Sequence, residues 1–402
     1  MKALDANPAL EGPALHEGVS SPVAVHRQRP TVCYPLAGDA LGGSHVSLRG
    51  LIDGLDPAQI EVIVVPEVPD GRLAAFFSGI AQCPDPARPT RPFVPGRSIG
   101  IGKVLGTLAG LPRRVRFLKE RGVDIVHTND GRSHASWALA ARLAGARLVW
   151  HHRGDPGARG LRYVAPVLAD RIVAVSAFAL PRGRRGAART ARVIHSPFDV
   201  SITADREAMR KRILEETGSP PETVICGYFG SFVERKRPLA FVKAVEALGR
   251  EIDRPVLGAM FGEPRETELD RQLDDRIAAV GAPARVVRMG YRSPGHAWLA
   301  GCDLLLVPAV DEPLGRTLVE AMLVGTLVVA TDSGGNPEAL RQGCGVLCPP
   351  DDPRAMARAA ADLLADPTLA RTMRQDATVA ARGRFSQARH VDAIRTIYDE
   401  LT

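Results

Sequence analysis

Short apolar runs alternate with longer amphipathic stretches along most of the chain. Runs such as "TVCYPL" at residues 31–36 and "DLLLVP" at 303–308 are apolar at consecutive positions rather than at alternate ones. This pattern is typical of parallel strands that are buried on both faces of a sheet. The remaining runs are residues 60–65, 124–127, 147–150, 171–175 and 192–195, then 223–229, 255–261, 285–289 and 326–330. Strands that alternate with helices predict an α/β fold with parallel sheets.

The runs fall into two sets, separated by the turn-prone "SPFD" and a charged helical stretch. A chain of 402 residues exceeds what one hydrophobic core usually organises. We therefore predict two doubly wound, Rossmann-like domains that bind ligands in the cleft between the carboxyl ends of their strands. The predicted segments are a loose leader at 1–29, a first domain at 30–200, a second domain at 201–384 and a final helix at 385–402.

Composition narrows the class of protein. The chain is 45% hydrophobic and 24% charged, and it has no uncharged apolar run of 18 residues, so it is predicted not to cross a membrane. The leader lacks the apolar segment of a signal peptide, which favours a cytoplasmic location. The six cysteines are scattered without metal-binding spacing, and we expect buried free thiols.

The positive charge is concentrated in the first half of the chain. Residues 1–200 hold 26 Lys and Arg against 16 Asp and Glu, whereas the rest hold 26 against 29. The basic residues gather at 103–122 and 181–192, which are candidates for contact with an anionic membrane on its cytoplasmic face. A solvated arginine-rich surface explains both segments equally well. Nucleic acid is not expected as a partner, because no aromatic residues interleave with these segments.

Candidate chemistry lies in the loops that follow the predicted strands. Gly42 and Gly43 follow the first strand and would allow close approach of an anion or a sugar, although an ordinary turn also explains them. Arg235, Lys236 and Arg237 follow the strand that ends at Phe229. They could neutralise a diphosphate, or they could simply be solvated.

Two carboxylates flank a predicted helix start in "DEPLGRTLVEAML". Glu312 precedes the helix, which we expect to begin near Gly315, and Glu320 lies inside it. Eight residues at about 100° each would leave the two carboxylates within about 80° of each other around the axis. Free N–H groups of the first turn would bind an anion between them, which suits a nucleotide sugar. Either glutamate alone is better explained as a helix cap or a surface ion pair. In the following "SGGNPEAL", Asn336 is expected to cap another helix.

The stretch "EPLGRTLVEAMLVGTLVVATDSGGNPE" resembles the paired-glutamate motif of the retaining glycosyltransferases of family 4, which have the GT-B fold. The motifs "GGSH", "DIVHTND", "AVSAFA", "VIHSPFD", "GSFVERK", "VRMGYR" and "CDLLLVPA" appear in the family's order. The resemblance implies that the final helix crosses back onto the first domain.

The resemblance also implies roles for individual residues. Glu312 would contact the donor sugar, Glu320 the ribose and Lys236 the diphosphate. Backbone N–H groups of Gly315, Arg316 and Thr317 would face sugar and phosphate. Gly43 would approach the donor from the first domain, and Tyr291 and Arg292 would contact the nucleobase.

The sequence departs from the family pattern at two places. Ser231 stands where the family usually has an arginine, so Arg235 or Arg237 would supply that charge. The family histidine that faces the sugar falls in "VWHHRGD", where its place is taken by His151, His152 or Arg153, and we choose His151.

The family mechanism needs no side-chain base, and no DxD-type motif follows a strand, so we predict transfer without a metal or other cofactor. Three hypotheses remain. The first is a retaining sugar transferase acting on a glycan or lipid-linked acceptor, in cell-surface polysaccharide or glycoconjugate synthesis. The second is a nucleotide-sugar epimerase or hydrolase, and the third a nucleotide-sugar-binding protein without turnover.

Overall fold

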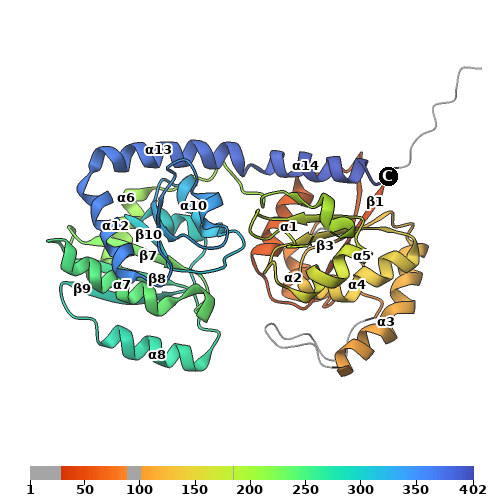
Figure 1. Ribbon diagram of the computed structural model, residues 1–402, viewed down its shortest axis with the longest axis horizontal. Coiled ribbons are helices and arrows are strands. Elements are labelled where there is room, and N and C mark those ends of the chain that lie inside the picture. The colour runs from red at the N-terminus through yellow and green to blue at the C-terminus, as the bar shows by residue number, and fades with distance from the viewer. Residues whose placement is uncertain (1–28, 88–100, 184) are drawn as a thin grey trace, which may run out of the picture.

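The computed structural model describes residues 29–87, 101–183 and 185–402, with the side chains of the helix that starts at Ile101 described from Ala109 onward. All of the predicted leader except Arg29 lies outside these residues. Two six-stranded parallel sheets organise the chain, with β1 to β6 in the first domain and β7 to β12 in the second (Figure 1). The predicted fold class is therefore confirmed.

The first sheet has the strand order β2-β1-β3-β4-β5-β6. Successive residues of its strands point to opposite faces. Val32 and Tyr34 pack with α1, α2 and the final helix, whereas Cys33 and Trp150 pack with α3, α4 and α5 on the other face. Its strands are β1 (Thr31–Leu36), β2 (Glu61–Pro66), β3 (Ile125–Thr128), β4 (Arg147–His152), β5 (Arg171–Ala174) and β6 (Arg192–Val193). Its helices are α1 (Gly43–Asp53), α2 (Arg72–Phe76), α3 (Ile101–Glu120), α4 (Gly131–Ala144), the π-turn Gly160–Val164 and α5 (Ala165–Leu168).

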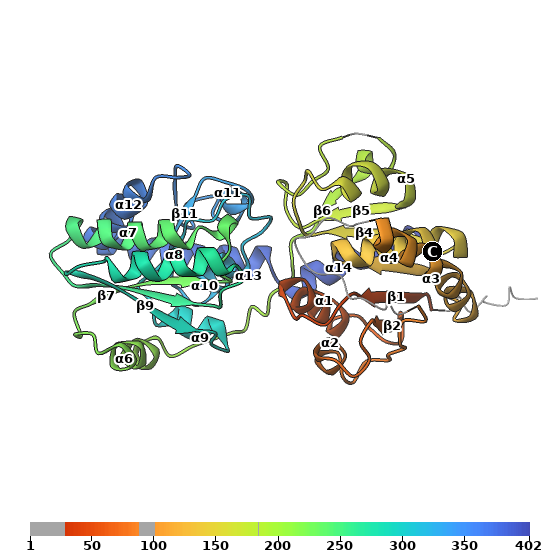
Figure 2. The ribbon, with the colours of Figure 1, turned by 90° about the horizontal axis from the view of Figure 1, so that it is seen from below.

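The second sheet has the order β12-β11-β10-β7-β8-β9, with helices on both faces (Figure 2). Its strands are β7 (Val224–Phe229), β8 (Val256–Phe261), β9 (Ala284–Gly290), β10 (Leu304–Val307), β11 (Leu327–Thr331) and β12 (Val346–Cys348). Its helices are α6 (Arg206–Thr217), α7 (Pro238–Glu251), α8 (Thr267–Ala278), α9 (Gly295–Ala300), α10 (Arg316–Leu323), α11 (Asn336–Ala339), α12 (Pro353–Ala365) and α13 (Pro367–Arg384). The sequence pattern did not predict β12, which has only three residues.

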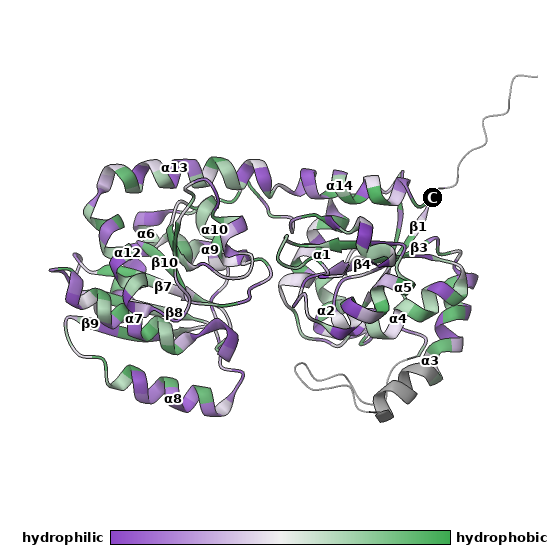
Figure 3. Ribbon diagram, in the orientation of Figure 1, coloured by the Kyte–Doolittle hydropathy of each residue, from purple (hydrophilic) through white to green (hydrophobic). Residues whose placement is uncertain are grey.

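The final helix, α14 (Gln387–Asp399), crosses back onto the first domain, as the resemblance implied (Figure 1). Figure 3 shows hydrophilic and hydrophobic residues alternating along α13 and α14. The apolar stripe of α14, formed by Val391, Ile394, Ile397 and Tyr398, is buried in the core that contains Tyr34. The hydroxyls of Tyr34 and Tyr398 lie 2.6 Å apart. The end of the chain therefore joins the first domain's core.

Two local expectations need correction. Helix α10 begins at Arg316, close to the expected start near Gly315, and Glu312 precedes it as expected; but the loop that holds Glu312 is not helical, so the angle between Glu312 and Glu320 is not set by helical periodicity. Asn336 does not cap α11, because Gly335 occupies the cap position and the buried Asn336 amide instead donates to the Thr331 carbonyl at 3.1 Å.

The cysteines agree with the expectation of free thiols. All six cysteines are free thiols, and all but Cys83 are buried. No helix in the described part of the chain is both long and apolar enough to span a bilayer.

Candidate active site

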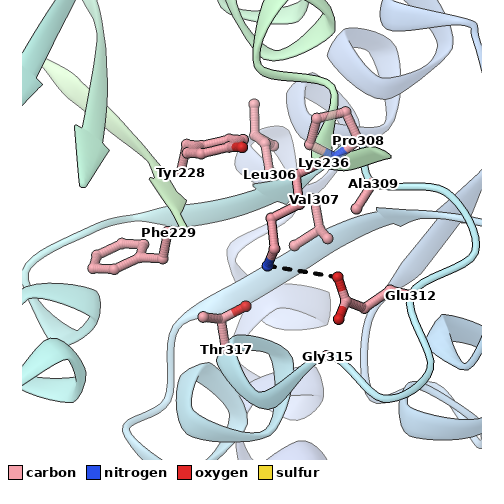
Figure 4. A pocket seen from close by; sticks show the side chains of 10 residues that line it. All are labelled: Tyr228, Phe229, Lys236, Leu306, Val307, Pro308, Ala309, Glu312, Gly315 and Thr317. Atoms are coloured by element: carbon pink, nitrogen blue, oxygen red, sulfur yellow. Dashed lines mark ion pairs between the residues drawn. The ribbon is translucent and has the colours of Figure 1, made fainter. Parts of the chain in front are cut away.

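A pocket lies where β7 and β10 end next to each other in the second sheet (Figure 4). Its walls come from the end of β7, the basic loop that follows, the end of β10 and the start of α10. Among the predicted site residues, Lys236, Glu312, Gly315 and Thr317 line it together. The carboxyl ends of parallel strands have thus brought together loops that are about 80 residues apart in the chain.

Lys236 enters this pocket because the backbone after β7 has no side chain in its way. Gly230 has φ 144°, and a Cβ at that position would lie 2.9 Å from the Lys236 Nζ. A larger residue would therefore both strain the backbone and displace the ammonium group. Of its neighbours, Arg235 turns toward Glu312, whereas Arg237 is paired with Asp351. Arg235 is thus the better placed of the two to supply the charge that Ser231 lacks.

Glu312 faces two cations across the pocket. Its Oε2 lies 2.6 Å from the Arg235 Nη1 and 3.5 Å from the Lys236 Nζ. The loop is held by Gly334 and Gly335, which pack against the backbone of Glu312 and Pro313, and Gly335 N–H donates to the Glu312 carbonyl at 2.7 Å. The Gly-Gly turn after β11 therefore fixes the position of the carboxylate.

Arg316 turns away from this pocket and joins the two domains. Its guanidinium donates to the Ser47 hydroxyl at 2.9 Å and to the Pro197 carbonyl at 3.2 Å, and it lies 4.2 Å over the Phe198 ring. Gly43 packs against it, since a Cβ at Gly43 would lie 2.9 Å from the Arg316 Cδ. The Gly-Gly motif after β1 is therefore in contact with the start of α10, although they belong to different domains.

Glu320 lies one turn along α10 from Arg316. Its Oε1 is 3.6 Å from the Arg316 Nη2. Burial raises the pKa of Glu320, and the charge of Arg316 offsets part of that shift. Glu320 is therefore a partly buried carboxylate beside the domain contact rather than a fully exposed surface charge.

Tyr291 and Arg292 follow β9 and do not line the pocket between β7 and β10. The Tyr291 side chain is 70% exposed. The Arg292 guanidinium is 3.1 Å from Glu216 and 5.2 Å over the Trp298 ring, so α6 and α9 hold it in place.

His151 is fully buried in a polar chain of the first domain. Its Nδ1 lies 3.1 Å from the His127 Nε2 and 3.4 Å from an Arg153 nitrogen. Arginine can only donate, so His151 accepts at Nδ1 and carries its proton on Nε2. His127 then donates from Nε2 and accepts at Nδ1 from Tyr398, which in turn accepts from Tyr34.

Burial, together with the positive charge of Arg153, holds the pKa of His151 well below its usual value, so the ring is neutral. The buried Nε2–H has no hydrogen-bond partner among the described residues. Of the other two residues considered for the family histidine, His152 bonds to the Asp155 carbonyl at 2.9 Å. Arg153 donates to Ser196 at 2.9 Å, and burial, followed by the charge of Arg316, lowers its pKa to about 9.

One polar contact between the domains was given no role from the sequence. The His195 Nε2 lies 2.7 Å from the Glu338 Oε1, and the other oxygen of Glu338 accepts from Ala177 N–H at 2.6 Å. Both residues lie in motifs recognised from the sequence, "VIHSPFD" and "GGNPE". The sequence did not predict that they pair, because a contact between two distant loops produces no local sequence pattern. Among the described residues, no group of three or more His, Cys, Asp or Glu side chains could hold a metal ion.

Models of two families match the chain in succession. Residues 41–202 match the model described as Glycosyltransferase Family 4, and residues 209–380 match the model described as Glycosyl transferases group 1. The chain belongs to glycosyltransferase family 4. The two matches cover the first and the second Rossmann-like domain, respectively.

Curated relatives are similar over part of their length. A D-inositol 3-phosphate glycosyltransferase from Thermobispora bispora is 28% identical over 313 residues, which cover 74% of this chain and 68% of the relative. The lipopolysaccharide core biosynthesis mannosyltransferase LpcC from Rhizobium leguminosarum bv. viciae is 28% identical over 211 residues, covering 52% of this chain and 59% of the relative.

Solved structures share the fold of this glycosyltransferase over nearly their whole length. HepE from Anabaena, in complex with UDP and glucose, has a TM-score of 0.77 at 21% identity and covers 92% of this chain and 99% of its own. The sucrose-phosphate synthase of Thermosynechococcus elongatus has a TM-score of 0.71 at 19% identity, covering 93% and 99%. At this identity the comparison shows that the GT-B fold is shared.

Proposed function

We propose that this chain is a retaining, metal-independent hexosyltransferase that moves a sugar from a UDP- or GDP-sugar to a glycan or lipid-linked acceptor. The observation that carries the proposal is the placement of Lys236 and Glu312 across one pocket, next to the N-terminus of α10 (Figure 4). A cationic group for the diphosphate and a carboxylate for the sugar are thus adjacent. Relatives named as glycosyltransferases, and HepE with bound UDP and glucose, support this assignment.

The donor diphosphate is proposed to bind to Lys236, Arg235 and the N–H groups of Gly315, Arg316 and Thr317, close to Gly43. The cap residue of α10, Gly315, has no side chain to bond the first turn, and Leu318 N–H donates to the Gly315 carbonyl at 3.1 Å, so within the first turn the N–H groups of Arg316 and Thr317 are proposed to bind the anion. In the free protein Glu312 partly neutralises Arg235 and Lys236. A bound diphosphate would replace Glu312 as the ion-pair partner of Arg235 and Lys236. The Glu312 carboxylate would then be able to contact the sugar.

The remaining donor contacts are proposed from the family pattern and from exposure. Glu320 would accept hydrogen bonds from the ribose hydroxyls, and its position one helical turn along α10 from Arg316 supports this. The exposed Tyr291 ring would stack on the base beside the anchored Arg292. The Nε2–H of His151, which has no partner among the described residues, would serve a sugar hydroxyl as a neutral donor once the side chains that bury it move aside, with Arg153 and His127 fixing the tautomer.

In the proposed reaction, the bond between the anomeric carbon and the β-phosphate oxygen breaks, and its electron pair goes to the phosphate. The acceptor hydroxyl forms the new bond to the anomeric carbon on the same face, and its proton passes to the departing phosphate oxygen. Lys236, Arg235 and the α10 N–H groups stabilise the phosphate charge, and Glu312 stabilises the positive charge on the sugar.

The first domain is proposed to bind to an anionic membrane surface through its exposed basic side chains. In segment 103–122, Arg113, Arg116 and Lys119 are exposed, but Arg114 is buried in an ion pair with Asp85 at 2.8 Å and is unavailable to lipid.

The side chains of residues 103–108, and Arg184 in segment 181–192, lie outside the described residues. Arg182 and Arg185 of the second segment are exposed. A role in cell-surface polysaccharide or glycoconjugate synthesis would follow from such a location.

Mixing the purified protein with candidate UDP- and GDP-sugars, with and without acceptors, tests the proposal. Transfer to an acceptor supports it. Release of nucleotide without any acceptor favours the hydrolase or epimerase. Tight binding without turnover under all conditions favours a nucleotide-sugar-binding protein.

A further inference from the structure

A second cavity, of about 780 Å³, lies in the first domain, outside the donor pocket. This volume is in the usual range for small-molecule sites, which is about 300–1,000 Å³. Its inner end is lined by residues that follow three adjacent strands: Ser44 after β1, Asn129 and Asp130 after β3, and Arg153 after β4. Ser44 neighbours Gly43, which contacts Arg316 of the second domain. The inner end is therefore adjacent to the contact between the domains.

The rest of the cavity is mostly apolar. Its walls are Ala138 and Leu139 of α4, Leu161 and Val164 of the π-turn, Leu168 of α5 and the Trp150 ring. The buried Trp150 indole has an Nε1–H without a hydrogen-bond partner among the described residues, and its ring stacks on His134 at 3.9 Å. His134, His152 and Asp155 also line the cavity, so polar groups are present in its mostly apolar wall as well as at its inner end.

The apolar surface continues out of the cavity. Leu139 is 37% exposed and Tyr163, at the outer rim, is 61% exposed. Val167 on α5, next to that rim in the chain, is 73% exposed. A compact apolar group would be enclosed by the cavity alone, whereas a hydrocarbon chain would also cover these rim residues.

Basic side chains accompany the rim. Arg162 lies 5.1 Å over the Tyr163 ring, and Arg159 lines the cavity and is exposed. The loop that contains Arg182 and Arg185 is held close to α5, because a Cβ at Gly186 would lie 1.9 Å from the Pro166 carbonyl oxygen. An apolar rim flanked by arginines matches the boundary between lipid chains and anionic headgroups.

We infer that this cavity binds the hydrocarbon chain of a lipid-linked acceptor, whose polar head lies at the inner end beside Asn129 and Arg153. The inference rests on the proposed transferase function and decides between its two acceptor classes. A purely glycan acceptor would leave Leu139 and Val164, which are 37% and 40% exposed, without an apolar partner.

Binding of octyl β-glucoside and methyl β-glucoside, both below the critical micelle concentration, tests the inference by calorimetry on the full chain. We expect the octyl compound to bind at least about tenfold more tightly, because only its chain reaches the apolar walls. L139E, which places a carboxylate in the chain's path, should remove this preference. L143E is the matched control, since Leu143 lies one turn further along α4, is 54% exposed and does not line the cavity.

Equal affinity of the wild type for the two glucosides would overturn the inference. So would an equal loss of octyl β-glucoside affinity in L139E and L143E. Tyr163→Ala, at an exposed position, provides a second variant that should weaken octyl binding without affecting folding. In the presence of a nucleotide sugar that the protein uses as donor, the wild-type kcat/KM for an octyl acceptor should exceed that for the corresponding methyl acceptor. In L139E the two kcat/KM values should be equal. Octyl selectivity without sugar transfer from any donor would overturn the transferase proposal but support the apolar site.

Discussion

Glu312 and Arg235 form an ion pair in which the Oε2 and Nη1 atoms are 2.6 Å apart, and Lys236 shares the same carboxylate oxygen from 3.5 Å. The pair joins two loops that follow β7 and β10. In the proposed mechanism these residues separate into a phosphate-binding and a sugar-binding group when the donor binds.

Lys236→Ala should weaken binding of both UDP and GDP by about 10- to 100-fold, because a charge-assisted hydrogen bond to phosphate is lost. Glu312→Gln should instead lower kcat by about 10²- to 10³-fold and change nucleotide affinity little. Calorimetry and steady-state kinetics measure the two effects. Lys243→Ala, at an exposed position of α7, is the charge-matched control. Equal effects of the two site variants on nucleotide affinity would contradict this division of roles.

Transfer should continue unchanged in excess EDTA, because cationic side chains and helix N–H groups are proposed to stabilise the leaving phosphate. The check is the initial rate with and without the chelator, at several donor concentrations. A loss of activity that added Mg²⁺ or Mn²⁺ restores would show that the mechanism needs a metal.

Arg316→Ala should lower stability by about 2 kcal/mol, since the contacts with Ser47, Pro197 and Phe198 are lost and Glu320 loses its cation. Thermal unfolding measures the change. Arg371→Ala, at an exposed position of α13, should leave the melting temperature unaltered. If the two variants had the same melting temperature, Arg316 would not be a structural link between the domains.

Arg114→Met should destabilise the protein by about 3–5 kcal/mol, because it leaves the buried Asp85 carboxylate without its cation. Combining it with Asp85→Leu should recover part of the loss, although the bond from Ala87 N–H to Asp85 is then also absent. Arg113→Met, at the exposed neighbouring position, is the control. Equal stability of the Arg113 and Arg114 variants in urea unfolding would refute the prediction.

The Glu338 and His195 pair should make stability depend on pH in the acid range. Burial raises the pKa of Glu338, but hydrogen bonds from His195 and Ala177 outweigh it, so the pKa in the folded protein lies below its ordinary value. The stabilisation is therefore present above the unfolded pKa of about 4.3 and is lost as pH falls through the folded pKa.

Melting temperatures of the wild type and Glu338→Gln, measured from about pH 6 down to about pH 3, test this effect. The advantage of the wild type should shrink toward the acid end. An advantage that is constant with pH would show that ionisation of Glu338 does not contribute.

The sequence by itself determined the two parallel sheets, because strands buried on both faces must be apolar at consecutive positions. The residues that follow β7 and β10 could be grouped into one site for a related reason: neighbouring parallel strands end at the same edge, which brings Lys236 and Glu312 together. The stripe on α14 likewise showed that this helix needed a partner surface.

Tertiary structure alone decided which charged and polar groups are buried and what they contact. Arg113 and Arg114 are adjacent in a basic segment, yet only Arg114 is turned toward Asp85 in the interior. His151 meets His127 from a neighbouring strand, and that ring in turn meets Tyr398 from the end of the chain. Burial and hydrogen bonding depend on which elements pack together, and contacts between distant segments leave no periodic pattern in the sequence.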